Sequence, residues 1–522
     1  IEHPETSLGS AAYARLRLTP VEQVQRARAF ESARMYPSAL STLRALAGSD
    51  QQAQAQFEIA RILLNRTRDN FDEAARIFGG LCLGQETSAE EACFLSAKAK
   101  GRGGDVIGAI AAFEAYRRRY PRGRFVDDAL FFGGFLRYET GRYQQARQVF
   151  LRITSGSWKK SARWYAAWSA YLAGQCALAQ PEFESIEAGA QRGREKRRAA
   201  YWAIRCLEQK DPAEAERRAV ALAGEHSFDW YSVLLRLRYP ERFASIALGG
   251  ATGSATVGLP KVFVDSIAEV RALADAGLSR FSKRALSVVG PRLRAAGHWR
   301  LEALVAQEIG DWRRGLQGAL NARGAVFRGV PDPDDMALWR MAYPTGFKRA
   351  VDSASGKHLV PTELIYAFIR KESAFEPSAV SHAHAVGLMQ LLPRTARKIQ
   401  GQRGALDPDV SGAALFDPAT NIDLGTWYIA GLDKRFGGQI PLVAAAYNAG
   451  PRSLVSWFRG RSSAPTDVFV ESIPFKETRE YVKRLTRSYI IYTLLGGSQS
   501  VSDALRNIPL NLDLTLRHGV DF

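Results

Sequence analysis

Four stretches in the first half of the chain share one pattern: FDEAARIF (71–78), VIGAIAAF (106–113), YQQARQVF (143–150) and CALAQPEF (176–183). Each stretch places an alanine four residues before a phenylalanine. The alanines are 35, 37 and 33 residues apart: Ala74, Ala109, Ala146 and Ala179. Repeats of this length are typical of stacked helical hairpins, in which the small residue permits close helix approach and the phenylalanine fills the neighbouring groove. The pattern predicts an α-helical solenoid.

The pattern extends in both directions from these four stretches. Ala39 with Leu43 and Ala215 with Ala219 continue it at the two ends. A glycine stands five residues before three of the alanines, where a turn between helices is needed: Gly104, Gly141 and Gly174. The pattern is similar to tetratricopeptide-type repeats, although their full signature is missing. The alternative is ordinary core periodicity in an irregular α-helical domain.

All four cysteines lie in this first half. Cys82 and Cys93 are placed symmetrically about one predicted turn, and Cys176 and Cys206 about another. Residues equidistant from the turn of an antiparallel hairpin face each other, so we expect the disulfides Cys82–Cys93 and Cys176–Cys206 and an oxidising compartment. The alternative is four buried thiols. No C-x-x-C pair and no finger-like histidine spacing is present, so no metal site is expected.

The chain has 522 residues, a length typical of about three domains. Hydrophobic residues make up 46% of it, which is enough to form several cores. Its formal charge of +18 predicts an anionic partner, namely nucleic acid, a membrane surface or an acidic polymer. The 21 basic and 16 acidic residues after position 344 leave only +5 there. No apolar stretch is long enough to predict a transmembrane segment. The start at Ile1, without Met, suggests a processed or trimmed N-terminus.

Two basic runs, RRRYPRGR (117–124) and RGREKRR (192–198), carry part of this charge. No aromatic-interleaved nucleic-acid motif accompanies them, so nucleic acid is not the expected partner. The Gly- and Thr-rich LGGATGSATVGLP (248–260) predicts a linker, and helical patterns return in 262–344. We therefore expect a superhelical repeat domain over 1–250, a helical linker domain over 251–344 and a third domain over 345–522.

The third domain carries the candidate chemistry. Its first helix, TELIYAFIRKESAF from 362, places Glu372 on an apolar stripe with Ile365, Phe368 and Ile369. A carboxyl group facing an apolar interior is either paired or has a raised pKa, and a raised pKa suits a general acid near neutral pH. From this residue alone, a general acid and a buried salt bridge are equally compatible.

Further helix boundaries follow along the third domain. Asp417-Pro418 predicts a helix start and Gly437-Gly438 its end. Ile440-Pro441 opens the next helix, and a long one begins near 475, with Glu477 and Tyr481 four residues apart on one face. Strand patterns are almost absent, so the domain is expected to be all-α.

Four motifs in a fixed order now carry a family resemblance. They are Glu372-Ser373, Gly387-Leu388-Met389-Gln390, Ala446-Tyr447-Asn448-Ala449-Gly450 and Glu477-Thr478-x-x-Tyr481. Together they resemble soluble lytic murein transglycosylases, over roughly 343–490. That resemblance implies a goose-lysozyme-like catalytic domain preceded by an α-superhelical domain. One departure is visible, because His384 stands where the family often has glycine.

The resemblance also implies the reaction and the roles of residues. Glu372 would be the single acid and base in non-hydrolytic cleavage of the bond between N-acetylmuramic acid and N-acetylglucosamine, which leaves a 1,6-anhydromuramoyl end. Ser373 would orient the carboxylate or bind an acetamido group, with helix capping as the alternative. Met389 would pack on a sugar face and Gln390 would hydrogen-bond it. Tyr447 and Asn448 would end their helix at the cleft, with the Tyr447 hydroxyl reaching Glu372 or the substrate. Tyr481 would close the opposite side, and Glu477 would organise the site.

Partners and location follow from the same resemblance. Peptidoglycan glycan strands would be the substrate, other cell-wall synthesis or remodelling proteins would be further partners, and the enzyme would be a monomer in the periplasm of a Gram-negative bacterium. No metal or organic cofactor is implied. The alternatives are a goose-type lysozyme that uses water, a non-catalytic peptidoglycan-binding scaffold and a nucleic-acid-binding solenoid.

Overall fold

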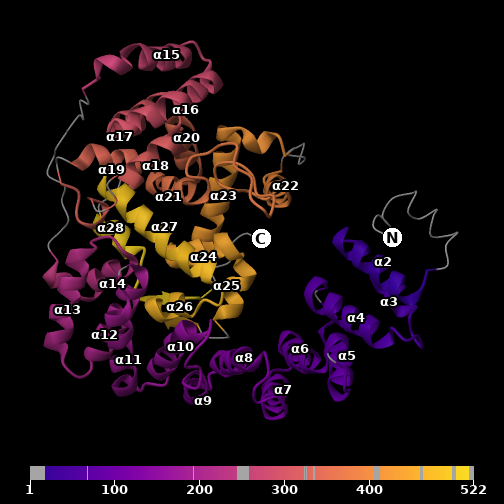
Figure 1. The fold of residues 1–522 in the computed structure, drawn as a ribbon. Coiled ribbons are helices and arrows are strands. Elements are labelled where there is room, and N and C mark those ends of the chain that lie inside the picture. Colours follow the sequence, from indigo (N-terminus) through magenta and orange to yellow (C-terminus); the bar gives the residue numbers. More distant parts are fainter. Residues whose placement is uncertain are drawn as a thin grey trace. The chain divides into compact units, whose positions relative to one another are not determined.

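The computed structural model describes residues 18–67, 69–86, 88–191, 193–243, 258–322, 324, 326–332, 335–404, 412–458, 462–496 and 501–515. The chain forms two compact units, Ile1–Pro212 and Ala213–Phe522, both drawn in Figure 1. Strands in the described part are the short β1 (Ser463–Pro465) and β2 (Asn511–Asp513), paired antiparallel. The predicted all-α class is confirmed. None of the described helices has the length and apolar character needed to cross a membrane.

The first unit is a succession of helices in which each packs on the next. Figure 1 shows them in sequence order from indigo to magenta. They are α2 (Pro20–Ser32), α3 (Tyr36–Arg44), α4 (Gln52–Arg66), α5 (Phe71–Leu83), α6 (Ala89–Arg102), α7 (Val106–Arg119), α8 (Val126–Glu139), α9 (Tyr143–Phe150), α10 (Lys159–Leu172), α11 (Cys176–Gly189) and α12 (Arg194–Leu207).

The repeated alanines and phenylalanines are the packing centres of this unit. All four alanines are 0% exposed, and each paired phenylalanine is at most 2% exposed. The glycines predicted to turn the chain have φ of 90°, 77° and 73° at Gly104, Gly141 and Gly174. Side chains rarely adopt this left-handed conformation, so glycine closes each helix before the next begins.

The cysteine prediction is confirmed for one pair and wrong for the other. Cys82 and Cys93 form a disulfide that joins the end of α5 to α6, with their Cα atoms 4.6 Å apart. Cys176 and Cys206 are free. The α11–α12 hairpin does bring them together, and Cys176 hydrogen-bonds the Cys206 thiol. Burial and, to a smaller extent, this neighbour raise the Cys206 pKa far above its usual range, so the Cys206 thiol stays protonated.

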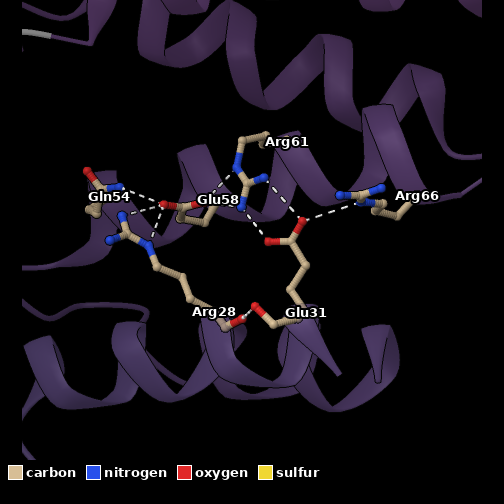
Figure 2. A network of polar contacts seen from close by, with 7 residues as sticks. Arg28, Glu31, Gln54, Glu58, Arg61 and Arg66 are labelled. Atoms are coloured by element: carbon tan, nitrogen blue, oxygen red, sulfur yellow. Dashed lines mark hydrogen bonds and ion pairs between the residues drawn. The ribbon is translucent and has the colours of Figure 1, made fainter. Parts of the chain in front are cut away.

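A network of charged side chains joins α2 to α4 (Figure 2). Glu58 is 5% exposed and accepts hydrogen bonds from Arg28 at 2.6 Å and Arg61 at 2.7 Å. Arg61 also donates to Glu31 at 2.5 Å. Burial alone would raise the Glu58 pKa, but the arginines outweigh it and the pKa is lowered. The carboxylate therefore stays ionised inside the helical stack.

The second unit begins with α13 and continues to the end of the chain. Its earlier helices are α13 (Pro212–Glu225), α14 (Trp230–Arg238), α15 (Val264–Asp275), α16 (Ser279–Ala295), α17 (Trp299–Glu308), α18 (Trp312–Ala322) and α19 (Met336–Ala342). Short 3-10 turns are η1 (Pro240–Arg242), η2 (Lys261–Phe263), η3 (Val326–Arg328) and η5 (Ala414–Phe416). Most of the linker predicted at 248–260 lies outside the described residues.

The later helices, orange to yellow in Figure 1, and the loops between them carry the motif residues. They are α20 (Lys348–His358), α21 (Thr362–Glu372), α22 (Pro393–Gln402), α23 (Pro418–Arg435), α24 (Ile440–Ala449), α25 (Pro451–Trp457), α26 (Thr466–Ser472), α27 (Lys476–Leu494) and α28 (Val501–Arg506). The predicted start of α23 is confirmed, because Asp417 caps it by accepting a hydrogen bond from the Thr420 amide at 2.8 Å. Helices α21 and α24 both pack on α27, which brings distant motifs together.

Candidate active site

Glu372 is the last residue of α21. The sequence predicted that this helix continues through Phe375, but that expectation is wrong. Ala374 and Phe375 have φ of 50° and 66°, so two consecutive non-glycine residues lie in the left-handed region and turn the chain sharply. Such strain persists only where the surroundings enforce it, and the Phe375 side chain is held in the core at 2% exposure. The carboxyl group is therefore presented at a helix end.

The pKa of Glu372 suits a proton donor near neutral pH. Burial raises it from 4.5 to about 7. A hydrogen bond from Tyr481 and the positive charge of Lys371 act in the opposite direction, and the negative charge of Glu477 adds to the increase. The residue still keeps part of its surface exposed, so a substrate atom can reach it. Of the two readings left open by the sequence, this favours a general acid, since the described contacts include no ion pair of Glu372.

Tyr481 is the residue that holds this carboxyl group. Its hydroxyl donates a hydrogen bond to Oε1 of Glu372 at 2.5 Å, and its side chain is 1% exposed. The ammonium nitrogen of Lys371 lies 4.5 Å from the centre of its ring. Burial and the neighbouring Glu372 raise the Tyr481 pKa well above its usual value. Tyr481 is thus a neutral donor fixed by α27.

Tyr447 does not reach Glu372, contrary to one of the two possibilities predicted for it. Its hydroxyl donates to the Met389 carbonyl oxygen at 2.7 Å instead. Its ring lies 4.6 Å from that of Phe368, which is one turn before Glu372 on α21. Tyr447 therefore connects α24 to the Gly387–Gln390 loop, and it supports the site by holding the backbone of that loop.

The loop from Gly387 to Gln390 is built differently from the prediction. Met389 is 0% exposed and packs against Gly425 of α23, where a Cβ would overlap its sulfur. It is part of the core and cannot pack on a sugar face in this conformation, so that prediction is wrong. Gln390 is partly exposed, but its amide nitrogen already donates to the carbonyl oxygens of Ala379 at 3.0 Å and Gly387 at 2.9 Å.

Asn421 organises this loop, and the sequence analysis missed it. Its side chain is 0% exposed and makes three hydrogen bonds. It accepts from the Met389 amide at 2.7 Å and donates to the carbonyl oxygens of Val386 at 3.0 Å and Leu415 at 2.9 Å. Gly387 has φ of 80°, and a Cβ there would overlap the Asn421 amide. The signal in the sequence that could have identified it is an asparagine one helical turn after the Asp417 cap.

The remaining motif residues lie around the same helix ends. Ser373 is 8% exposed and donates to the Ile369 carbonyl oxygen at 3.2 Å, which is the helix-terminal arrangement kept as its alternative role. Asn448 accepts a hydrogen bond from the Thr478 hydroxyl at 2.7 Å. Glu477 is exposed. A pocket of about 460 Å³ is lined by Asn448, Glu477 and their neighbours Ala449, Pro474, Phe475, Lys476 and Thr478.

His384 and His382 are exposed. His384 adopts φ of 61°, so it takes the left-handed conformation that the expected glycine would favour, and the loop forms despite the substitution. Within the described ranges, no three His, Cys, Asp or Glu side chains are grouped as a metal site would require.

Comparison with known proteins places this geometry in context. Residues 349–470 match the family model of the transglycosylase SLT domain. The chain is 41% identical over 164 residues to the soluble lytic murein transglycosylase of Escherichia coli K12, a match that covers 30% of this chain and 24% of that protein. It is 36% identical over 165 residues to membrane-bound lytic murein transglycosylase C of Klebsiella pneumoniae 342, covering 27% of this chain and 45% of that protein. The chain thus matches less than half the length of these relatives.

Two solved structures share the fold at low sequence identity. An inactive mutant of the lytic transglycosylase Slt from Pseudomonas aeruginosa superposes with a TM-score of 0.63 at 20% identity, covering 99% of this chain and 79% of that one. The complex of the 70-kDa soluble lytic transglycosylase with bulgecin A gives 0.57 at 18% identity, covering 91% and 81%. These two structures show a shared fold. The predicted resemblance to lytic murein transglycosylases is confirmed by the transglycosylase SLT domain match and the sequence relatives.

Proposed function

We propose that this protein is a peptidoglycan lytic transglycosylase in which Glu372 is the single catalytic acid and base. The observation that carries the proposal is the position of Glu372: a carboxyl group at the end of α21, with a pKa raised to about 7 and one oxygen held by Tyr481. The match of residues 349–470 to the transglycosylase SLT domain supports the same assignment.

The first step is proton transfer from Glu372 to the glycosidic oxygen. Oε1 accepts the Tyr481 hydrogen bond, which leaves Oε2 to carry the proton. The bond between C1 of the muramic residue and the protonated oxygen then breaks, and the N-acetylglucosamine hydroxyl leaves. Positive charge develops at C1, where the 2-acetamido group of the substrate stabilises it. Glu372 is now ionised.

In the second step the C6 hydroxyl oxygen of the same muramic residue attacks C1. Its proton returns to Glu372, so the enzyme is restored and a 1,6-anhydro ring is formed without consumption of water. Glycosidases that use two carboxylates hold them either about 5 Å or about 6.5–9.5 Å apart across the sugar. Glu477 is the other carboxylate of the motifs, but it is exposed, and intramolecular attack removes the need for it.

The surroundings of such a reaction follow from the same proposal. Peptidoglycan strands are the substrate, and cell-wall synthesis or remodelling proteins are further partners. The enzyme acts as a monomer in the Gram-negative periplasm. That location is consistent with the Cys82–Cys93 disulfide, since disulfides persist in oxidising compartments. The net charge of +18 favours retention on a polymer whose peptides carry carboxylates. The divisions near 250 and 344 remain the proposed domain boundaries.

Mass spectrometry of the products from purified sacculi tests the reaction. Anhydro-muropeptides are lighter than hydrolytic products by one water, so they support the proposal, whereas full-mass products indicate a goose-type lysozyme. Glu372→Gln should abolish turnover and keep glycan binding. Binding without turnover by the unmodified protein would instead indicate a scaffold.

A further inference from the structure

Helix α14 is joined to α26 and α27 by buried charged groups, although it lies outside the match to the transglycosylase SLT domain. The Tyr231 hydroxyl donates to Oε2 of Glu471 at 3.0 Å and accepts a hydrogen bond from Nζ of Lys483 at 2.8 Å. Lys483 also donates to the same oxygen of Glu471 at 3.0 Å. At the other end of α14, Arg238 donates to Asp467 at 3.1 Å. These contacts hold α14 against α26 and, through Lys483, against α27.

The spacing of these residues makes the contact between α14 and α26 specific. Tyr231 and Arg238 are seven residues apart on α14, and Asp467 and Glu471 are four residues apart on α26, so each pair lies on one face of its helix. Asp467 is 2% exposed and Glu471 is 3% exposed. Both contacts can form together in only one register and one orientation of the two helices.

Buried charges of this kind act on geometry more than on stability. A buried ion pair can often be replaced by apolar residues of similar volume without loss of stability, whereas a buried charge without its partner is costly. A shift of α27 against α26 would separate Lys483 from Glu471 and leave both charges buried. The ion pair therefore disfavours every arrangement of these helices except the observed one.

The position of α27 matters because this helix carries Tyr481. Helix α26 leads directly into α27 over residues 473–475. Lys483 follows Tyr481 by two residues, and at about 100° per residue their side chains point about 200° apart around the helix axis. Lys483 therefore holds α27 from one side, while Tyr481 on the other side donates its hydrogen bond to Glu372.

We infer that Tyr231 of α14 is a positioning residue for the reaction: by fixing Glu471 and Lys483 it sets the place of α27 and keeps the Tyr481 hydroxyl on Glu372. This inference rests on the proposed function. It makes a helix outside the SLT-domain match part of the catalytic apparatus. A contact that served stability alone would leave the environment of Glu372 unchanged when it is removed.

The test compares two tyrosines that each lose a hydrogen bond to a carboxylate. Tyr231→Phe removes the hydroxyl and keeps the ring, which lies 4.9 Å from the Lys483 ammonium nitrogen. The matched control is Tyr116→Phe in α7, a buried tyrosine whose hydroxyl donates to Glu90 at 2.7 Å. Turnover of murein strands by the full-length protein is measured against pH. The pKa of Glu372 is measured without substrate by carbon-13 NMR of labelled glutamate, with Glu372→Gln to assign the signal.

Tyr231→Phe should lower kcat/KM at pH 7 roughly tenfold, since misplacement of a catalytic group by about 1 Å costs about a hundredfold. The Tyr481 hydrogen bond lowers the Glu372 pKa, so weakening that bond should raise this pKa above about 7. Tyr116→Phe should also lower the free energy of unfolding, but it should leave kcat/KM and the Glu372 pKa unchanged. An unchanged Glu372 pKa in Tyr231→Phe would overturn the inference.

Two further variants test the route through α27. In a Tyr481→Phe background, Tyr231→Phe should have no additional effect on the Glu372 pKa, and an equal shift there would contradict the inference. The double variant Lys483→Met with Glu471→Leu should fold with nearly normal stability and still show reduced kcat/KM, so normal turnover by it would also count against the inference. If the unmodified protein shows no turnover, the proposed function fails, whereas the NMR titration still decides whether Tyr231 positions Tyr481.

Discussion

The hydroxyl of Tyr481 donates a hydrogen bond of 2.5 Å to Oε1 of Glu372, across 109 residues of sequence. This bond stabilises the ionised carboxylate, whereas burial stabilises the protonated form, and burial prevails. Tyr481 stays neutral because its own pKa is raised well above its usual value. The pair therefore fixes one oxygen of Glu372 and leaves the other to exchange a proton with the substrate.

Tyr481→Phe removes this bond and should raise the pKa of Glu372 above about 7. The acid form then persists to higher pH, so the alkaline limb of the profile of kcat/KM against pH should shift to higher pH. We expect activity to fall at least tenfold, since the carboxyl group is no longer oriented. The matched control is Tyr492→Phe on the same helix, which loses a hydrogen bond to the Pro344 carbonyl oxygen at 3.0 Å. A control profile that moves equally would contradict the assignment.

Glu372 should lower the stability of the protein as the pH rises. Its pKa is 4.5 when unfolded and about 7 when folded. The contribution of Glu372 to the free energy of unfolding is therefore fully present below pH 4.5. It falls by about 3 kcal/mol in total as the pH rises from 4.5 to 7. Glu372→Gln has no such loss. Its unfolding free energy in urea should exceed that of the unmodified protein by about 3 kcal/mol more at pH 8 than at pH 4. A difference independent of pH would show that the carboxyl group is not shifted.

Asn421→Ala should release the Gly387–Gln390 loop. The substitution leaves the Met389 amide and the Val386 and Leu415 carbonyl oxygens without their buried partner. We expect a loss of about 3 kcal/mol in unfolding free energy, since each unsatisfied buried group costs about 1–3 kcal/mol and water can satisfy part of them. Turnover should fall as well. Asn65→Ala, at an exposed position of α4, serves as the control and should be neutral.

A buried ion pair joins α26 to α27. Lys483 donates to Glu471 at 3.0 Å and to the Tyr231 hydroxyl of α14 at 2.8 Å, and Glu471 is 3% exposed. Lys483→Met removes the ammonium group that the buried Glu471 carboxylate binds and should cost about 3–5 kcal/mol. The double variant Lys483→Met with Glu471→Leu should recover most of that loss. The free energy of unfolding in urea is measured for both variants. If the double variant is as destabilised as the single variant, the two charges do not act as a pair.

Much of the helical architecture could be predicted because its signals are local. The alanine–phenylalanine repeat depends on packing between neighbouring helices, and the turns depend on single glycines such as Gly104. Asp417 and Pro418 mark the start of α23 by capping geometry alone. The Cys82–Cys93 disulfide followed from hairpin symmetry. The same symmetry also predicted a bond between Cys176 and Cys206, which are free in the structure, because bonding depends on side-chain geometry that spacing does not define.

The sequence by itself determined the all-α class, the repeat and the order of the motif residues. Only the tertiary structure decided which tyrosine holds Glu372: the motifs led us to expect the Tyr447 hydroxyl near Glu372 or the substrate, whereas the Tyr481 hydroxyl makes that contact. It also buried Met389 in the core, revealed Asn421 and raised the pKa of Glu372. The physical reason is the distance in sequence between the interacting residues. A helix forms through interactions within a few residues. Burial and hydrogen bonding of a side chain depend on helices that lie far apart in the sequence and meet only in the fold.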